Sequence, residues 1–297
     1  MQLSPILIAI LFGLGAMIGW GSADFFAKKA TEKVGYAISM FYMQTFGLIP
    51  LALIIILSPT IQIERISPSI LVQISVFALV YIIAYLFLYL VFEKGKLSIV
   101  SPIGSTWSAL SVFISVFIFK EPLNSWILIW LFVIIAGILI LSTDIQALRK
   151  DIKNIKNLKA GVVFALLEAI IMGIYFPVYN HFLESLSLNT FYLLFIFRIF
   201  TTIFAFIYVK IKKISITKID KQTLMLLLLI GFLDIFAYTS LTFGLALTPY
   251  TSIVTVLSAT FTIPTIIFAK IFLKEKITKE QLVGIALIVA GIVFLVG

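Results

Sequence analysis

Long apolar runs alternate with short polar segments along the whole chain. Each run is close to the roughly 20 residues that a helix needs to cross the hydrocarbon core of a bilayer. The runs are separated by charged residues, prolines and clusters of Asn or Ser, and they cover residues 5–27, 36–57, 69–92, 98–119, 126–143, 160–183, 188–209, 222–246, 250–273 and 279–297. The pattern predicts an all-α integral membrane protein with ten transmembrane helices.

The composition agrees with this pattern and excludes several classes of protein. Hydrophobic residues make up 62% of the 297 residues and charged residues only 12%, whereas soluble domains hold about 45–50% apolar and about 25% charged residues. The longest hydrophilic segment, residues 144–159, is too short to form a domain. An ordinary soluble enzyme, a disordered chain and a nucleic-acid-binding domain are therefore excluded.

Residues that bind metals or form disulfides are scarce. The chain has no cysteine and one histidine, which excludes disulfides, thiol catalysis and Cys-ligated metals and disfavours a histidine metal site. We expect no cofactor, no metal and no catalytic residue. The expected partners are the lipid bilayer and a small-molecule substrate, with no nucleic acid, and the protein is expected to be a monomer or a homodimer.

The basic residues are distributed unevenly between the connecting segments. Of the 22 Lys and Arg residues, 19 follow an odd-numbered run; Arg65 and Lys120 follow even-numbered runs, and Arg198 lies inside one. Basic residues mark the cytoplasmic side of a membrane protein. The net charge of +9 therefore predicts a multi-pass protein of the cell (plasma) membrane, with odd-numbered loops in the cytoplasm and both termini outside.

The chain partly matches itself when it is shifted by 154 residues. Ser98–Val100 then falls on Ser252–Val254, and Lys120-Glu121 falls on Lys274-Glu275, all without a gap. The matches divide the chain into a first half (residues 1–143), a cytoplasmic linker (144–159) and a second half (160–297).

Each half contains five apolar runs, so the second half enters the membrane the opposite way up. Inverted repeats of this kind are typical of transporters, whose substrate site lies near the midplane between the repeats. We therefore expect two inverted five-helix repeats around a central cavity, although a duplication kept only for packing is an alternative.

Several short motifs resemble those of a known family. A Trp-Gly pair stands late in the first run (Trp20-Gly21), and an acidic loop follows the fourth run of each half (Phe119–Leu123 and Leu273–Ile277). The last run of each half carries glycine with small neighbours. Together with the five-plus-five pattern, these motifs resemble the ten-span EamA family of the drug/metabolite transporter superfamily. The resemblance implies a basket of ten helices in which the fifth helix of each half packs outside, and export or exchange of small metabolites, often amino acids.

Four ionisable residues lie within the predicted spans: Asp24, Glu168, Arg198 and Asp234. Such residues cost about 2.5–3.5 kcal/mol each on insertion scales and are functional candidates by default. Arg198 needs an anionic partner or water, and Asp234 and Glu168 are the candidate anions at a suitable depth. The group is either a buried ion pair that fixes packing, or a site where Arg198 binds a substrate anion and an acid carries a coupling proton. For Asp24, a helix-end pair with Lys28 is the favoured interpretation.

Aromatic residues inside the spans form stripes at helical spacing. A tyrosine stripe facing a cavity would offer flat apolar walls and hydroxyl groups to an amphipathic solute, and helix packing is the alternative. The candidate substrate-binding residues are Trp20, Tyr85, Tyr89, Trp107, Tyr175, Tyr179, Arg198, Asp234 and Tyr238. Prolines are expected to interrupt three helices and to act as hinges at Pro102, Pro177 and Pro264.

These features favour a secondary-active transporter that exports or exchanges amino acids or similar amphipathic solutes by alternating access. One basic residue within the spans fits a zwitterionic or neutral solute better than a phosphorylated metabolite, although an exchanger of phosphorylated metabolites stays an alternative. A membrane-embedded lipid-modifying enzyme is the alternative from another class, and no cluster of acids, histidines or metal ligands supports it.

Overall fold

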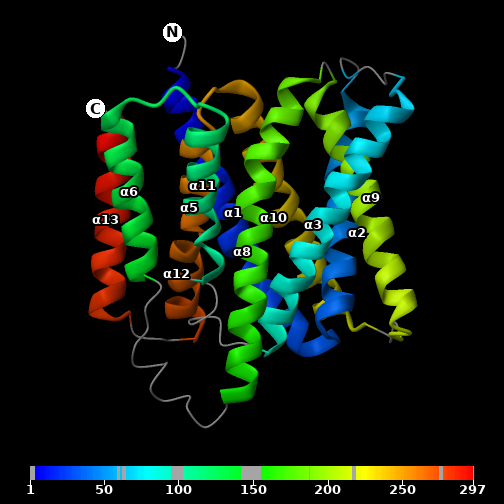
Figure 1. Cartoon of the computed structure of the whole chain (residues 1–297). Coiled ribbons are helices and arrows are strands. Elements are labelled where there is room, and N and C mark those ends of the chain that lie inside the picture. Colours follow the sequence, from blue (N-terminus) through cyan, green and yellow to red (C-terminus); the bar gives the residue numbers. More distant parts are fainter. Residues whose placement is uncertain are drawn as a thin grey trace.

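The computed structural model describes residues 4–58, 61, 65–94, 103–141, 155–186, 188–215, 219–273 and 277–296. All regular elements within these residues are helices, as Figure 1 shows, which confirms the expected all-α class. The described helices of the first half are α1 (Pro5–Val34), α2 (Tyr36–Leu57), α3 (Pro68–Lys94), α5 (Trp107–Phe113), the π-helical turn η1 (Ile114–Ile118) and α6 (Ser125–Leu141). Those of the second half are α8 (Ile155–Glu184), α9 (Thr190–Ile211), α10 (Lys221–Leu247), α11 (Thr251–Ser258), the 3₁₀ turn η3 (Ala259–Phe261), α12 (Thr262–Leu273) and α13 (Lys279–Val296).

Seven helical stretches of the described residues are long and apolar enough to cross a membrane, with α11, η3 and α12 together forming one of them. Two further apolar helices, Trp107–Ile118 and Ser125–Leu141, are shorter than that criterion. The protein is therefore a multi-pass membrane protein. The count of ten spans and the inverted relation of the halves stay predictions.

Local sequence explains where α1 begins and ends. The Ser4 hydroxyl accepts a hydrogen bond from the Leu7 amide, and Pro5 occupies the first helical position, where its missing N–H costs nothing. Gly35 has φ of 80°, which separates α1 from α2 in a single residue. The helix is seven residues longer than the predicted span, so Lys28, Lys29 and Lys33 lie in its last turns and not in a loop.

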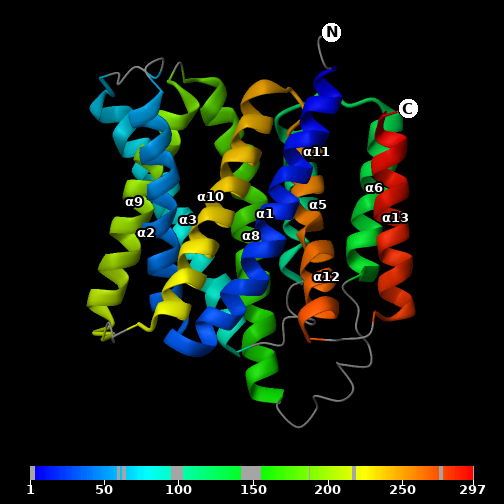
Figure 2. The ribbon, with the colours of Figure 1, turned by 180° about the vertical axis from the view of Figure 1, so that it is seen from behind.

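The helices form one layered bundle, which Figures 1 and 2 show from opposite sides. Helix α1 packs along α10 near the centre, α3 packs against α8, and α2 packs against α9 at one edge. Both termini lie at the same end of the bundle. Each of the close pairs α1–α10 and α2–α9 joins one helix from each half, so the two halves are interleaved.

Helices α6 and α13 form a separate pair at the opposite edge (Figures 1 and 2), each being the last helix of its half. Glycines allow their close contact: a Cβ at Gly137 would lie 2.9 Å from the carbonyl oxygen of Gly284. Small residues commonly permit such approach between membrane helices. The outer position agrees with what the family resemblance implied for these two helices.

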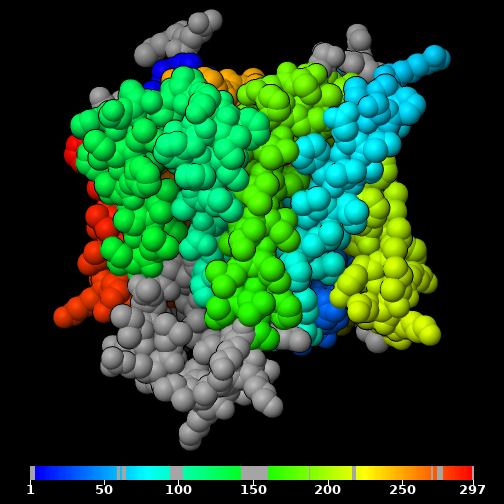
Figure 3. All heavy atoms as spheres, viewed as in Figure 1, coloured from blue at the N-terminus to red at the C-terminus, as the bar shows by residue number. Residues whose placement is uncertain are grey.

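The outer surface of the bundle is apolar. Many large hydrophobic side chains are exposed, including Ile56, Leu57 and Ile211 with more than 70% of their surface accessible. Figure 3 shows one face of the bundle, which is covered by side chains of α6, α5 with η1, α8, α3 and α9. Soluble monomers rarely expose apolar patches larger than a few hundred Å², so this surface fits contact with lipid.

Candidate functional site

A buried ion pair joins α9 and α10. Nη1 of Arg198 lies 2.8 Å from Oδ2 of Asp234, and the two side chains are only 1% and 3% exposed. The other carboxylate oxygen of Asp234 accepts a 2.7 Å hydrogen bond from the Tyr85 hydroxyl of α3. The sequence offered Asp234 and Glu168 as partners for Arg198, and the structure selects Asp234.

The remaining donors of Arg198 bind the backbone of α2. Its Nε donates to the carbonyl oxygen of Gln44 and its Nη2 to that of Met43, both at 3.1 Å. The Gln44 side chain is itself held by a 2.9 Å bond from the hydroxyl of Thr201. The guanidinium is thus bound by groups from both halves, which offsets part of the high cost of burying a charge.

Two glycines make room for this network. A Cβ at Gly47 would lie 2.6 Å from Cζ of Arg198, so α2 has space for the guanidinium only because this residue has no side chain. On α10, a Cβ at Gly231 would lie 3.0 Å from the carbonyl oxygen of Met43. Close contact of α2 with α9 therefore depends on Gly47, and its close contact with α10 depends on Gly231.

A cluster of buried tyrosines adjoins the ion pair. Tyr81 stacks on Tyr85 with ring centroids 4.3 Å apart and contacts Tyr238 at 5.0 Å. The hydroxyls of Tyr175 and Tyr238 are hydrogen-bonded at 2.7 Å, and Tyr179 stacks on Tyr175 at 5.4 Å. Candidate residues from α3, α8 and α10 thus form one continuous cluster of aromatic rings.

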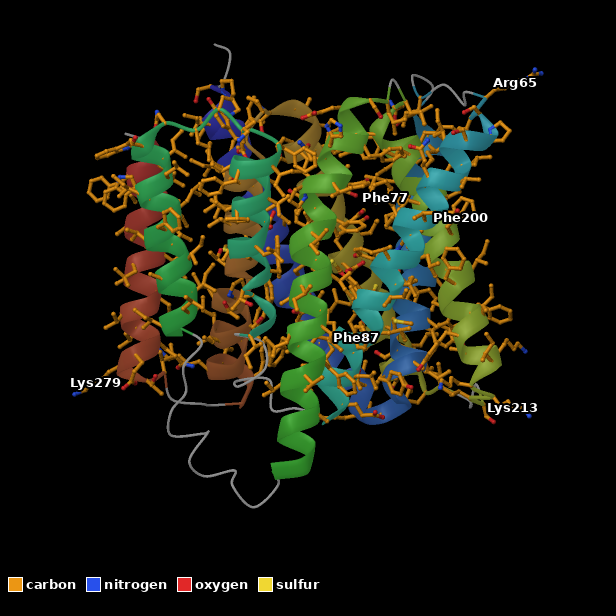
Figure 4. The ribbon with its side chains drawn as sticks, in the orientation of Figure 1. Arg65, Phe77, Phe87, Phe200, Lys213 and Lys279 are labelled. Atoms are coloured by element: carbon orange, nitrogen blue, oxygen red, sulfur yellow. The ribbon has the colours of Figure 1, made fainter. Side chains whose placement is uncertain are left out.

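Figure 4 labels Phe77 and Phe87, which show how far the aromatic contacts extend along α3. Phe77 meets Tyr175 at 5.8 Å and Phe182 at 4.8 Å, whereas Phe87 stacks on Phe164 of α8 at 5.9 Å. Aromatic contacts therefore line the boundary between α3 and α8 over several turns.

The two candidate tryptophans meet at a different aromatic ring. Trp107 of α5 lies 4.8 Å from the ring of Phe176, and Trp20 of α1 lies 5.9 Å from the same ring. Trp20 is 7% exposed, and its indole N–H has no hydrogen-bond partner among the described residues. Tyr89, the last candidate of the α3 stripe, is also buried and stacks on Tyr85 at 6.5 Å.

The other two ionisable candidates line a small cavity. Asp24 of α1 and Glu168 of α8 face this space together with Gly104 and apolar residues of α3, α8 and η3. The expected helix-end pair of Asp24 with Lys28 is wrong: Nζ of Lys28 donates to the carbonyl oxygen of Phe92 at 2.6 Å and lies 3.4 Å from Glu32. Helix α1 does not end near Asp24 but continues to Val34. Lys28 therefore lies within the helix and binds Phe92 of α3 and Glu32.

The prolines fall into different environments. Pro177 does not interrupt α8, which continues through it from Ile155 to Glu184, because membrane helices tolerate the loss of one hydrogen bond where neighbouring helices pack around it. Before Pro264 the helix does change character, with the 3₁₀ turn η3 separating α11 from α12. Pro102 lies outside the described residues. The hinge roles themselves stay predictions.

Some residues of the network were absent from the candidates. Gln44 is fully buried in the middle of a predicted span, and a polar residue at that depth was a signal that could have identified it. Tyr81 belongs to the same stripe as Tyr85 and Tyr89. The contributions of the Met43 carbonyl and of Gly47 depend on helix contacts that no sequence motif marks.

No group of three or more His, Cys, Asp or Glu side chains among the described residues could hold a metal ion. The paired charges, tyrosine hydroxyls and aromatic rings can instead provide polar contacts and apolar walls within the bundle. Together with the lipid-facing surface, the fold and this site define a multi-pass helical membrane protein with a buried polar centre.

The chain belongs to the EamA-like transporter family, whose sequence profile matches residues 7–143 and again residues 159–297. This places it in the drug/metabolite transporter superfamily. The chain is 33% identical over 134 residues to the uncharacterized protein MJ1333.1 of Methanocaldococcus jannaschii, a match that covers 45% of this chain and 96% of that protein. It also superposes on a protein of known crystal structure with a TM-score of 0.71 and 15% identity, covering 96% of this chain and 94% of the other. At this identity the likeness shows the fold alone.

Proposed function

We propose that this protein is a secondary-active transporter that exports or exchanges amino acids or similar amphipathic solutes. The observation that carries the proposal is the buried Arg198–Asp234 pair, which is shared between α2, α3, α9 and α10 and adjoins the tyrosine cluster. Membership of a family of transporters supports the general class.

The chemistry of the pair favours a zwitterionic solute. An amino acid carries one carboxylate and one ammonium group. The carboxylate could replace Asp234 as the partner of Arg198, and the ammonium group could replace Arg198 as the partner of Asp234. Such an exchange of partners leaves neither buried charge unpaired, and an unpaired buried charge is costly. The tyrosine rings would pack against the apolar part of the solute. A phosphorylated solute would require more cations than Arg198, the one arginine or lysine among the fully buried side chains of the described residues.

Alternating access provides the mechanism for this exchange. In the present arrangement the Arg198 donors bind Met43, Gln44 and Asp234, so the pair is closed to solvent. Solute entry requires α2 and α3 to separate from α9 and α10 on one side of the membrane. Bonds to the solute then compensate for the ion pair and the hydrogen bonds that opening breaks, and release on the other side restores the ion pair.

Transport by purified protein in lipid vesicles tests the proposal. Uptake of individual labelled amino acids is measured with and without a pH gradient. We expect uptake by the wild type, and uptake at the level of protein-free vesicles for Arg198→Ala and Asp234→Asn. Because each single change leaves one buried charge unpaired, the double variant Arg198→Gln/Asp234→Asn is tested as well, and size-exclusion chromatography verifies that every variant is folded.

Arg65→Ala provides the matched control, because Arg65 is exposed at one end of the bundle (Figure 4) and should be dispensable. Normal uptake by folded Arg198→Ala and Asp234→Asn would disprove a solute site at the ion pair. Turnover of vesicle lipid without movement of any solute would support the lipid-modifying enzyme instead.

We further propose that the protein lies in the plasma membrane with both termini outside. Arg65 lies at the end that carries the termini, and Lys213 and Lys279 lie at the opposite end (Figure 4). The excess of basic residues after odd-numbered spans supports a cytoplasmic position for the second end. Because the chain has no cysteine, single cysteines can report the orientation. A membrane-impermeant maleimide should label Arg65→Cys in intact cells and Lys213→Cys only after permeabilisation; the reverse pattern would invert the proposed orientation.

A further inference from the structure

The cavity between Asp24 and Glu168 is chemically distinct from the Arg198–Asp234 pair. Its other lining residues are Leu88, Val91, Phe92, Gly104, Ala165 and Phe261. None of these described residues contributes a charged or polar side chain, so the two carboxyl groups are the polar side chains of the described lining. Neither residue of the Arg198–Asp234 pair lines it.

Glu168 is a buried residue of the cavity lining. The residue is 7% exposed, and among the described residues none donates a hydrogen bond to its carboxyl group or pairs with it as a cation. Its Oε2 lies beside Gly104: a Cβ built at Gly104 would be 3.2 Å from this oxygen. A buried, ionised carboxylate without a partner is strongly unfavourable. The arrangement therefore requires a ligand that neutralises charge.

The size of the cavity restricts that ligand. The space available to the centre of a water-sized sphere is about 10 Å³, which is room for about one water molecule. An organic solute is too large for it. A metal ion is also disfavoured, because hard cations take about six or more oxygen ligands and the described lining offers only two carboxyl groups. A proton, carried on a carboxyl group beside one water molecule, satisfies both the size and the charge.

An aromatic group lies on the same helices as the cavity residues and consists of Trp20, Phe176 and Trp107. Trp20 lies one turn from Asp24 on α1, Trp107 follows Gly104 by three residues, and Phe176 lies two turns beyond Glu168 on α8. Helix α1 runs away from the end that holds the chain termini, and α5 and α8 run toward it (Figures 1 and 2), so all three residues lie nearer to that end along their helices than Asp24, Gly104 and Glu168. Their rings contact one another through Phe176 on that side of the carboxyl groups.

Other ionisable groups lie near the cavity on the helices that surround it. Asp234 of α10 and Tyr89 of α3 lie within electrostatic range of Asp24. Lys28 of α1 is one turn from Asp24 but is bound to Phe92 and Glu32. Helix α3 connects the two centres, because it presents Tyr85 to Asp234 and Leu88 and Val91 to the cavity. A movement of α3 that opens the ion pair would thus also change the surroundings of the two acids.

We propose that the Asp24–Glu168 cavity is a proton-binding site, separate from the solute site, through which solute transport is coupled to a proton gradient. The coupling rests on the proposed transporter function, whereas proton binding itself does not. The proton is bound as a carboxylic O–H of Glu168 or Asp24 and leaves to water when the cavity opens. The ion pair then carries the solute and this cavity carries the proton.

Infrared spectroscopy of the full chain in lipid tests proton binding without any solute. Glu121→Gln serves as the background, because Glu121 is also partly protonated near neutral pH. In this background the protein should show the C=O stretching band of a protonated carboxyl group at neutral pH, and the band should be lost when Glu168→Gln or Asp24→Asn is added. Glu184→Gln is the matched control, because Glu184 has an exposed side chain near the end of the same helix. Absence of the band in the Glu121→Gln background, or its persistence unchanged in both cavity variants, would overturn the proposal.

Transport measurements test the coupling. For a labelled amino acid that the wild type carries, an imposed pH gradient should stimulate uptake. In Glu168→Gln this stimulation should be lost while solute exchange without a gradient continues. Full stimulation in Glu168→Gln would overturn the coupling. Failure of the wild type to carry any amino acid would contradict the proposed function, and the infrared result would still decide whether the cavity binds a proton.

Discussion

At the scale of single residues, Gly47 provides the clearest test of the ion-pair network. Replacing it by alanine would place a methyl group against the guanidinium of Arg198, 2.6 Å from Cζ. Overpacking of this kind costs about 1–3 kcal/mol, so Gly47→Ala should lower the thermal unfolding midpoint in detergent. The control is replacement of Ile49 by alanine, because Ile49 is on the same helix and is 47% exposed. Ile49→Ala should change the midpoint less. An unchanged midpoint for Gly47→Ala would show that α2 and α9 can move apart without cost.

Individual residues also show what the sequence can and cannot determine. Depth within a span can be estimated from sequence position, which is why Arg198 was matched to acids at suitable depth. The face of a helix is harder to assign, because apolar residues surround these helices on all sides. Sequence alone therefore left Asp234 and Glu168 as equal partners for Arg198, and it paired Asp24 with Lys28 when helix packing brings Asp24 to the cavity of Glu168.

At the scale of elements, every predicted span overlaps described helix, and most differences lie at the ends. The apolar pattern locates the part of a helix that lipid surrounds, but α1 and α8 continue beyond it through charged residues. Polar residues at the membrane surface are compatible with helix, so hydropathy alone cannot locate the last turn. The outward position of α6 and α13 followed from the family resemblance, and their glycines supply the physical reason.

Irregular turns within the spans were only partly foreseeable. Pro264 marked the region in which η3 divides the ninth span, since a proline removes a helical hydrogen bond at the preceding turn. The π-helical turn η1 has no proline or glycine within it and no signal in the sequence. At Pro177 the sequence predicted an interruption that the structure does not have, because the packed helix α8 continues through this proline.

At the scale of the whole molecule, Glu121 connects the two halves near the end that carries the termini. Its carboxyl group accepts bonds from the backbone N–H of Ser252 at 3.0 Å and from the Ser252 hydroxyl at 2.6 Å. Ser252 lies in the first turn of α11, where free N–H groups and the helix dipole favour an anion. The repeat in the sequence relates Glu121 to Glu275 and Ser252 to Ser98, and both of these equivalents lie outside the described residues. The internal repeat thus identified the residues of this contact, although not the contact between the halves.

This contact should make the stability of the molecule depend on pH. Burial raises the pKa of Glu121 from 4.5 to about 7, since loss of hydration disfavours the carboxylate more than the bonds from Ser252 favour it. Between these two values the folded protein holds a proton that the unfolded chain releases. The stabilisation is therefore complete below about pH 4.5, decreases as the pH rises, and is lost above about pH 7.

Replacing Glu121 by glutamine should remove this dependence, because the amide keeps the shape of the side chain but does not titrate. As the pH rises from about 5 to about 8, the wild type should lose up to about 3 kcal/mol of stability relative to Glu121→Gln, measured as a falling difference in thermal unfolding midpoint. Other titrating groups are common to both proteins and cancel in the difference. Glu280→Gln, at an exposed position on α13, should follow the wild type at every pH. A constant difference between wild type and Glu121→Gln would mean that Glu121 ionises at its ordinary pKa, and that protonation does not control this contact between the halves.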